Sequence, residues 1–359
     1  MSASFIDSAL ETRIRTACRE LENDLVQMTS ALIAFPSLLG QEHEAQDYMA
    51  ERFDAMGLEA KRLAIDEHEL RAHPAYSPSL VSYEGRENVI GIHRPRGDVH
   101  GRSLILNGHI DVVPVGVADL WTDSPWSPRV DGDRLYGRGA ADMKAGIAAY
   151  TLAFDVFRRL GLEPAAPVYL QSVIEEECTG NGALACLVAG YEADAAVITE
   201  PVPGIMRAQM GVVWLHLDVT GRPVHAREAH AGASAIEYAY YLYERLKTLE
   251  AEWNQPENRH PDYADAEHPI NFNLGRIDGG EWGSSVACAC SATLRIGFYP
   301  GRDVEGVVAD VEAALRSAAA EHPKNENLAY RIRRGGFAAR GSELLAVQGL
   351  VAARGNQRF

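Results

Sequence analysis

The sequence predicts an α/β protein in which a mostly parallel sheet with helices on both faces is joined to a smaller α+β domain. Short apolar runs alternate with helical patterns up to about residue 205, and this alternation is typical of a parallel sheet covered on both faces. After Met206 the pattern changes to half-exposed strands and amphipathic helices. A length of 359 residues is also enough for about two domains.

The elements of the larger domain follow from apolar spacing and from the residues that end each run. Helical spacing extends from about Ala9 to Ile33, closed by Pro36, and again from Glu42 to Gly57. The predicted strands are ENVIGIH, the run that starts with LILNGH at Leu104, APVYLQSVI and ADAAVITEP. Two further helices are predicted, one following Asp142 and one around Leu184 and Leu187.

The second part of the chain has the element order β-α-β-β-α-β. Its strands are VVWLHLDVTG, HPINFNLGRIDGG, CSATLRIGFYPG and LAYRIRRGG, and its helices are AIEYAYYLYERLKTLEAEW and DVEGVVADVEAALRSAAAEH. This order is the ferredoxin-like pattern. We therefore expect an inserted domain over 206–334, with 1–205 and 335–359 forming the larger domain.

Composition excludes several classes of protein. The chain has 34 basic and 50 acidic residues, a formal charge of −16, whereas nucleic-acid binding needs a basic surface. No apolar stretch has the length of a membrane span, and the N-terminus does not resemble a signal peptide. Five cysteines without a regular framework suit a reducing compartment. We expect a cytoplasmic protein that binds neither nucleic acid nor membrane.

Acidic and histidine residues follow several of the predicted strands. They are His109 with Asp111, Asp142, the run 175–177 and Glu200. Each by itself is more often a structural or solvated residue, but ligands of parallel sheets gather beyond the carboxyl ends of the strands. Carboxylates that converge there repel one another unless a multivalent cation neutralises them. Mixed imidazole and carboxylate ligands favour zinc and would also suit cobalt or manganese.

Four segments, in this order, carry a family resemblance: NGHIDVVP, GRGAADMKAG, EEECTGNGA and ITEP. They resemble the four sequence blocks of the dinuclear zinc deacylase and exopeptidase family, which includes acetylornithine deacetylase, succinyl-diaminopimelate desuccinylase, aminoacylase and glutamate carboxypeptidase. The resemblance implies a zinc-exopeptidase-like catalytic domain and an inserted dimerisation domain. It also implies a homodimer.

Carried onto this sequence, the resemblance implies two metal ions. His109 and Glu200 would bind one ion, Glu177 would bind the other, and Asp142 would bridge both. The peptide bond between Asp142 and Met143 would be cis, as it is after the bridging aspartate of the family.

The resemblance implies three more functional residues. Glu176 would be the general base that takes a proton from the metal-bound water as it attacks the acyl carbonyl. Asp111 would accept a hydrogen bond from the His109 ring and fix its tautomer. His225, in GRPVHA, would reach across a dimer and stabilise the oxyanion in the partner's active site. Glu175 stands where the family usually has aspartate and would support Glu176.

The sequence departs from the family pattern near its end. The family supplies a fifth metal ligand, a histidine in the last part of the catalytic domain, but no histidine follows His322 in this sequence. We therefore expect the second ion to bind weakly and activity to be low. The closing strands and helices of the family also have no counterpart here, so we expect exposed apolar surface or a bare sheet edge.

The function expected from the sequence is hydrolysis of an amide bond. The leading hypothesis is a metal-dependent amidohydrolase that removes an acyl group from an N-acyl amino acid, similar to acetylornithine deacetylase and succinyl-diaminopimelate desuccinylase. Glu200 favours it, since a glutamate there is more usual in the deacylases and carboxypeptidases of the family. One alternative is a metallo-exopeptidase that acts on a short peptide. Another is a truncated, catalytically silent homologue that only dimerises.

Overall fold

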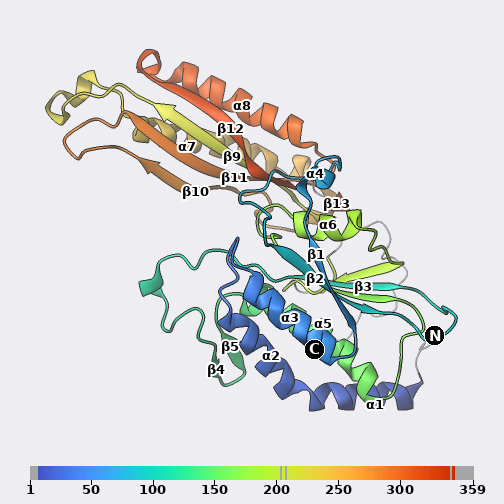
Figure 1. The fold of residues 1–359 in the computed structure, drawn as a ribbon. Coiled ribbons are helices and arrows are strands. Elements are labelled where there is room, and N and C mark those ends of the chain that lie inside the picture. The colour runs from blue at the N-terminus through green and yellow to red at the C-terminus, as the bar shows by residue number, and fades with distance from the viewer. Residues whose placement is uncertain (1–6, 203, 207, 340–341, 344–359) are drawn as a thin grey trace. The chain divides into compact units, whose positions relative to one another are not determined.

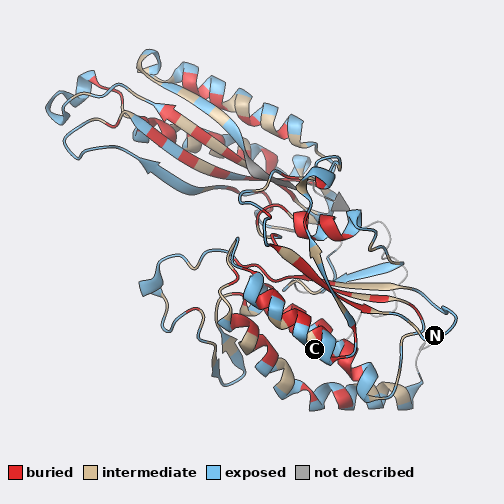
Figure 2. Ribbon diagram, in the orientation of Figure 1, coloured by how far each residue is buried: buried red, intermediate tan, exposed pale blue. Residues whose placement is uncertain are grey.

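A computed structural model of the chain describes residues 7–202, 204–206, 208–339 and 342–343. The chain divides into two compact units, Met1–Pro203 and Gly204–Phe359, each with its own hydrophobic core. Buried residues alternate with exposed ones along the strands and helices of each unit (Figure 2). Among the described residues, no helix combines the length and the apolar character needed to cross a membrane.

The first unit is built around a five-stranded sheet in the order β1-β2-β6-β3-β7 (Figure 1). β3 pairs in parallel with β6 and β7, whereas β2 pairs antiparallel with β1 and β6, so four strands point one way and β2 is reversed. The mostly parallel sheet predicted from the sequence is confirmed. The strands are β1 (Glu59–Ala64), β2 (Glu87–His93), β3 (Leu104–His109), β6 (Val168–Val173) and β7 (Ala195–Ile198).

Helices cover both faces of this sheet. On one face, Gly91 of β2 packs under Phe53 of α3, and a Cβ at this glycine would lie 2.8 Å from the ring. On the other face, Ile90 of β2 packs with Cys186 of α6. The helices are α1 (Ser8–Glu20), α2 (Glu22–Ala34), α3 (His43–Ala55), α4 (Glu67–Leu70), α5 (Ala145–Arg159) and α6 (Asn181–Val188).

Three features of the first unit differ from the sequence-based expectation. The helical run expected from Ala9 to Ile33 is two helices, α1 and α2, which meet at the buried Leu21. Strand β1 was not predicted, because its EAKRLA segment is half exposed and carries no apolar run. The hairpin of β4 (Arg129–Asp131) and β5 (Arg134–Tyr136) was also missed, since strands of three residues give no periodic signal.

The second unit contains a four-stranded antiparallel sheet in the order β10-β11-β9-β12. The chain order β9-α7-β10-β11-α8-β12 is the predicted β-α-β-β-α-β pattern, which is therefore confirmed. Its main elements are β9 (Gly211–Thr220), α7 (Ala235–Trp253), β10 (Phe272–Gly279), β11 (Ala289–Phe298), α8 (Val304–Glu321) and β12 (Ala329–Ala339). Short 3₁₀ segments connect them at Ala226–Ala231, Pro256–Asn258, Pro261–Tyr263 and Asn325–Asn327.

The last strand runs further than expected. β12 continues to Ala339, beyond the boundary predicted at residue 334, with a register shift between Arg334 and Ala338. Beyond it, β13 (Ser342–Glu343) pairs with β8 (Ala208–Gln209). Residues 335–339 thus belong to β12. Residues 340–341 and 344–359 lie outside the described residues, so for the rest of the segment 335–359 the expected return to the first domain stays a prediction.

One edge of the first sheet is exposed. β7 lies at the end of the sheet, and in the described part of the chain it pairs with β3 alone. Its apolar residues Val197 and Ile198 are 47% and 58% exposed.

Candidate metal centre

His109 is the last residue of β3, and its side chain is almost completely buried. Its Nδ1 lies 2.9 Å from the main-chain carbonyl oxygen of Asp111. A carbonyl oxygen can only accept, so Nδ1 carries a proton and donates it to this bond. The other ring nitrogen, Nε2, faces Asp142 Oδ1 at 3.0 Å. The ring atom directed at the acidic cluster, and available to a cation, is therefore Nε2.

Asp111 accepts a hydrogen bond from the His109 ring, as predicted, and the accepting atom is its main-chain carbonyl oxygen. The Asp111 carboxylate lies farther from the ring, 3.6 Å from His109 Nδ1. The carboxylate oxygens instead accept hydrogen bonds from the main-chain N–H groups of Glu176 and Glu177, each at 3.1 Å. Asp111 thus joins the end of β3 to the loop after β6.

Asp142 lies on an irregular turn, Ala140–Lys144, that leads into α5. The peptide bond between Asp142 and Met143 is cis, as predicted. Lys144, which is fully buried, ties this turn to the end of α2 by donating to the carbonyl oxygens of Leu32 and Phe35, both at 2.8 Å. The turn therefore holds the Asp142 carboxylate beside His109.

Glu176 and Glu177 lie in the loop between β6 and α6. Ligand atoms of His109, Asp142 and Glu177 all lie within 4.8 Å of one another. The Glu176 carboxylate reaches to 3.9 Å from His109 Nε2, and its side chain is 47% exposed. The Glu177 carboxylate thus belongs to the closest ligand group, whereas the Glu176 side chain remains about half exposed to solvent.

Glu200, two residues after β7, completes the cluster at the ends of the strands. Its Oε1 lies 3.7 Å from His109 Nε2, and the side chain is 27% exposed. The four predicted metal ligands therefore lie close together. Asp142 and Glu177 form the closest ligand group with His109, and Glu200 lies beside the His109 ring. Their division between two ions stays a prediction.

The carboxylates of this cluster lie close together and are partly buried, which shifts the pKa values of its members. Burial raises the pKa of Glu177 and of Glu200 to about 7, and the neighbouring carboxylates add to this effect. Burial by itself would lower the pKa of His109, but the Asp111 and Asp142 carboxylates raise it to about 11. Protons thus compensate the crowded carboxylates, and a divalent cation could replace them. The donor set of one imidazole and several carboxylates fits zinc, cobalt or manganese.

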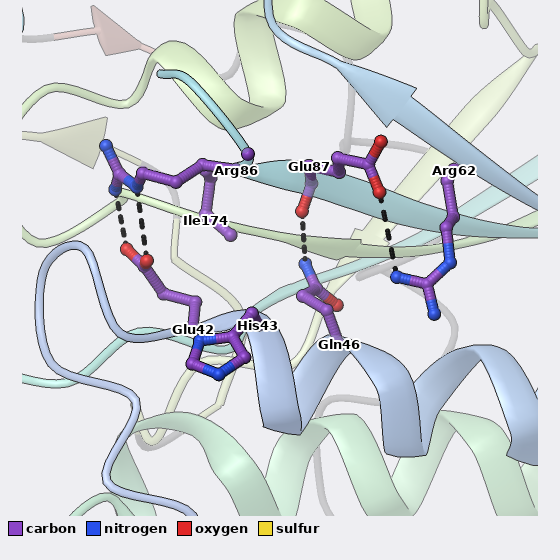
Figure 3. Close-up of a pocket in the computed structure, with 8 residues that line it drawn as sticks. Glu42, His43, Gln46, Arg62, Arg86, Glu87 and Ile174 are labelled. Atoms are coloured by element: carbon purple, nitrogen blue, oxygen red, sulfur yellow. Dashed lines mark hydrogen bonds and ion pairs between the residues drawn. The ribbon is translucent and has the colours of Figure 1, made fainter. Parts of the chain in front are cut away.

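The sequence analysis missed a buried network of ion pairs next to the loop after β6. It consists of Glu42, Arg86 and Glu175. Arg86 forms two hydrogen bonds with the Glu42 carboxylate, and these two residues face each other in Figure 3. The same guanidinium lies 3.3 Å from the Glu175 carboxylate. All three side chains are at least nine-tenths buried. No spacing rule joins residues 42, 86 and 175, so only the fold reveals this group.

A comparison with protein families identifies the chain. Residues 105–339 match the profile of Peptidase family M20/M25/M40, which is more than half of the sequence. This chain belongs to that family. The resemblance drawn from the four sequence blocks is confirmed.

Two curated relatives of this M20 family member are deacylases by name. N-formyl-4-amino-5-aminomethyl-2-methylpyrimidine deformylase of Bacillus subtilis is 32% identical over 240 residues, covering 64% of this chain and 56% of that protein. Succinyl-diaminopimelate desuccinylase of Dinoroseobacter shibae is 28% identical over 309 residues, 83% of this chain and 74% of that protein. The chain thus spans little more than half the length of the deformylase.

Solved structures of the M20 family share the fold. Human carnosine dipeptidase 1 has a TM-score of 0.68 at 14% identity, covering 93% of this chain and 82% of that one. A dinuclear metal-binding peptidase of the family from Bacillus subtilis has a TM-score of 0.54 at 14% identity, covering 92% and 77%. At these identities the likeness extends to the fold alone.

The remaining histidines of interest lie in the second unit. His225 is exposed, and its Nδ1 accepts a hydrogen bond from the main-chain N–H of Arg227 at 3.1 Å, which caps the following 3₁₀ segment. His322 packs against the rings of Tyr238 and Tyr241, with centroids 4.9 and 4.8 Å away. His322 is thus a packing residue of the second unit, whereas the proposed role of His225 stays a prediction.

Proposed function

We propose that this M20 family member is a metal-dependent amidohydrolase that removes an acyl group from an N-acyl amino acid or a related small amine. The observation that carries the proposal is the convergence of His109, Asp142 and Glu177, with ligand atoms within 4.8 Å of one another at the carboxyl ends of the strands. Glu200, 3.7 Å from His109 Nε2, supplies a fourth ligand.

The residues of the site have distinct parts in this reaction. His109, Asp142, Glu177 and Glu200 would hold the cation, which is zinc in our proposal. A divalent cation bound there would lower the pKa of a water molecule and would polarise the carbonyl group of the substrate. In our proposal one ion is bound by His109, Glu200 and the bridging Asp142. The second ion then has two protein ligands, Asp142 and Glu177, so we propose that it binds more weakly.

Glu176 is proposed as the general base. It accepts a proton from the water that adds to the acyl carbon, and it passes this proton to the nitrogen as the C–N bond breaks. Partial burial raises the pKa of its carboxyl, and the Asp111 and Asp142 carboxylates add to this effect, which makes Glu176 a stronger base. The half of its side chain that remains exposed can approach a substrate, while Asp111 fixes its main chain.

The substrate class is proposed from the relatives. Two proteins at 28% and 32% identity are named for removing a succinyl and a formyl group. The dipeptidase neighbour is 14% identical, a level that carries the fold alone. Deacylation is therefore favoured over the exopeptidase alternative.

A substrate panel tests the proposal. Metal-free protein would be incubated with Zn²⁺ or Co²⁺ and with N-formyl, N-acetyl and N-succinyl amino acids, N-formyl amines and dipeptides. We expect release of free amine from at least one acyl substrate, lost with a chelator and restored by metal. Cleavage of dipeptides alone would favour the exopeptidase.

Variants separate an enzyme from the catalytically silent alternative. Glu176→Gln should lower kcat by at least about 100-fold while metal still binds, because it removes the base and keeps the ligands. Glu177→Gln should weaken metal binding itself. Metal binding without turnover of any substrate in the panel would favour the silent homologue.

We also propose that the chain forms a homodimer through its second unit and acts in the cytoplasm. Support for the dimer comes from exposed apolar residues of the second unit, in which β10 is an edge strand. We refer to four of these exposed residues as the dimer surface: Ile236, Tyr240, Ile277 and Trp282. In such a dimer, His225 would serve the partner's active site.

A further inference from the structure

Arg86 connects two buried carboxylates that come from distant parts of the chain. Its Nη2 and Nε bind the two oxygens of Glu42 at 2.6 and 3.2 Å, which fixes the plane of the guanidinium. The remaining Nη1 is directed at Glu175 Oε2, 3.3 Å away. Arg86 is 8% exposed, Glu42 2% and Glu175 0%. Figure 3 shows Arg86 above Glu42 at the start of α3.

Glu175 is held in an unusual main-chain conformation. Its φ is +67°, and it is the one described residue other than glycine with a positive φ. Side chains with a Cβ rarely adopt this region unless the surroundings impose it. Its carbonyl oxygen accepts hydrogen bonds from the N–H groups of Thr179 and Gly180 at 3.1 and 2.9 Å. The loop therefore turns sharply at Glu175.

The turn at Glu175 sets the direction of the main chain at the next two residues, Glu176 and Glu177. The N–H groups of Glu176 and Glu177 both point at the Asp111 carboxylate. One side of the loop is thus fixed by Asp111, beside the metal centre, and the other side is fixed by Arg86 through Glu175. Neither Arg86 nor Glu42 belongs to the closest ligand group of the centre.

We propose that Arg86, oriented by Glu42, is a positioning residue of the metal centre, which holds Glu175 and through it the geometry of Glu176 and Glu177. The inference rests on the proposed function, because it needs Glu177 to be a ligand. An arginine is required here, since a lysine is a point charge and cannot bind both oxygens of Glu42 while reaching Glu175.

Two conservative substitutions test this role. Arg86→Lys keeps the buried positive charge but loses the paired N–H groups that bind both oxygens of Glu42. Glu175→Gln keeps an acceptor for Arg86 but loses the negative charge of the ion pair. Each should weaken Co²⁺ binding to the metal-free protein by about tenfold or more, as partners of metal ligands do elsewhere. Titration calorimetry measures this affinity, and the visible absorption of bound Co²⁺ reports altered ligand geometry. The double variant should be no weaker than the poorer single variant, because both changes break one connection.

The matched control is Arg62→Lys. A small cavity is lined by Arg62 as well as by Glu42 and Arg86 (Figure 3). Arg62 pairs with Asp47 at 2.6 Å on a half-exposed surface and does not contact Glu175. Its substitution should leave Co²⁺ affinity and spectrum unchanged. Thermal unfolding of the metal-free variants separates a local change from a general loss of stability; should Arg86→Lys not fold, Glu175→Gln decides the matter.

The outcomes separate this inference from the proposed function. If wild-type protein binds Co²⁺ and both folded variants bind it with wild-type affinity and spectrum, Arg86 is not a positioning residue, although the proposed function stands. An equal loss of affinity in Arg62→Lys would also overturn the inference. If the wild-type protein binds no metal, the proposed function fails and this inference with it.

Discussion

Asp111 shows how one side chain can organise a site without being a ligand. Its main-chain oxygen orients the His109 ring, and its carboxylate accepts the N–H groups of Glu176 and Glu177. A carboxylate can accept both bonds because each of its two oxygens is an acceptor, whereas an amide has one acceptor oxygen. The residue therefore links the imidazole ligand to the loop that carries the proposed base.

Asp111→Asn should weaken Co²⁺ binding by about tenfold to 100-fold, because one of the two N–H groups loses its acceptor and the loop shifts. Titration calorimetry on metal-free protein measures the change. The control is Asp194→Asn, since Asp194 also accepts a main-chain bond, from Ser103, but lies at the opposite end of β3 from His109. Unchanged affinity in Asp111→Asn would show that the loop keeps its position without this residue.

Metal binding should depend on pH near neutrality. The pKa of Glu177 and of Glu200 is raised to about 7 by burial and neighbouring carboxylates, so below this pH both carboxyls hold protons that a cation must displace. The apparent Co²⁺ affinity should therefore fall as the pH drops from about 8 to about 6, with protons released on binding. Calorimetry in two buffers of different ionisation enthalpy checks this. A pH-independent affinity would contradict it.

At the scale of elements, the site lies where strand ends meet two irregular connections. β3 ends in His109 and β7 is followed by Glu200, while the turn Ala140–Lys144 and the loop between β6 and α6 bring the other carboxylates. Both connections are anchored by side chains that are not proposed metal ligands. Lys144 anchors the first to the end of α2, and Asp111 with Arg86 anchors the second.

Lys144→Met should destabilise the metal-free protein by about 1–3 kcal/mol, because the carbonyl oxygens of Leu32 and Phe35 lose their buried donor while the stem still packs. Urea unfolding followed by circular dichroism measures this. Lys61→Met on β1 is the control, since that side chain is exposed. Equal stability of the two variants would mean that water replaces the Lys144 ammonium without cost.

At the scale of the whole molecule, the proposed metal centre and the proposed dimer surface belong to two separately packed units. The first unit holds all four proposed metal ligands, and the second has its own core between the sheet and the helices α7 and α8. The exposed residues of the proposed dimer surface are confined to the second unit. Changes to that surface should therefore leave metal binding intact.

Ile277→Lys combined with Trp282→Glu should convert the dimer to a monomer, because both side chains are exposed apolar residues that a partner would bury, 42% and 73% exposed in this chain. Light scattering coupled to size exclusion measures the mass. Leu120→Lys in the first unit, where Leu120 is 84% exposed, is the matched control and should not change it. A wild-type monomer, or a variant that stays dimeric, would contradict the proposal.

The sequence by itself determined the fold class, the β-α-β-β-α-β order of the second unit and the residues that gather beyond the strands. Apolar periodicity is local, and His109, Asp142, Glu177 and Glu200 stand in recognisable blocks. What only the tertiary structure decided is how these residues are held. The Asp111 carboxylate binds the loop after β6 and not the His109 ring, and Arg86, just before β2, joins Glu42 to Glu175, just after β6. Such contacts unite residues far apart in sequence, and no local pattern encodes them, because they exist only once the strands have paired.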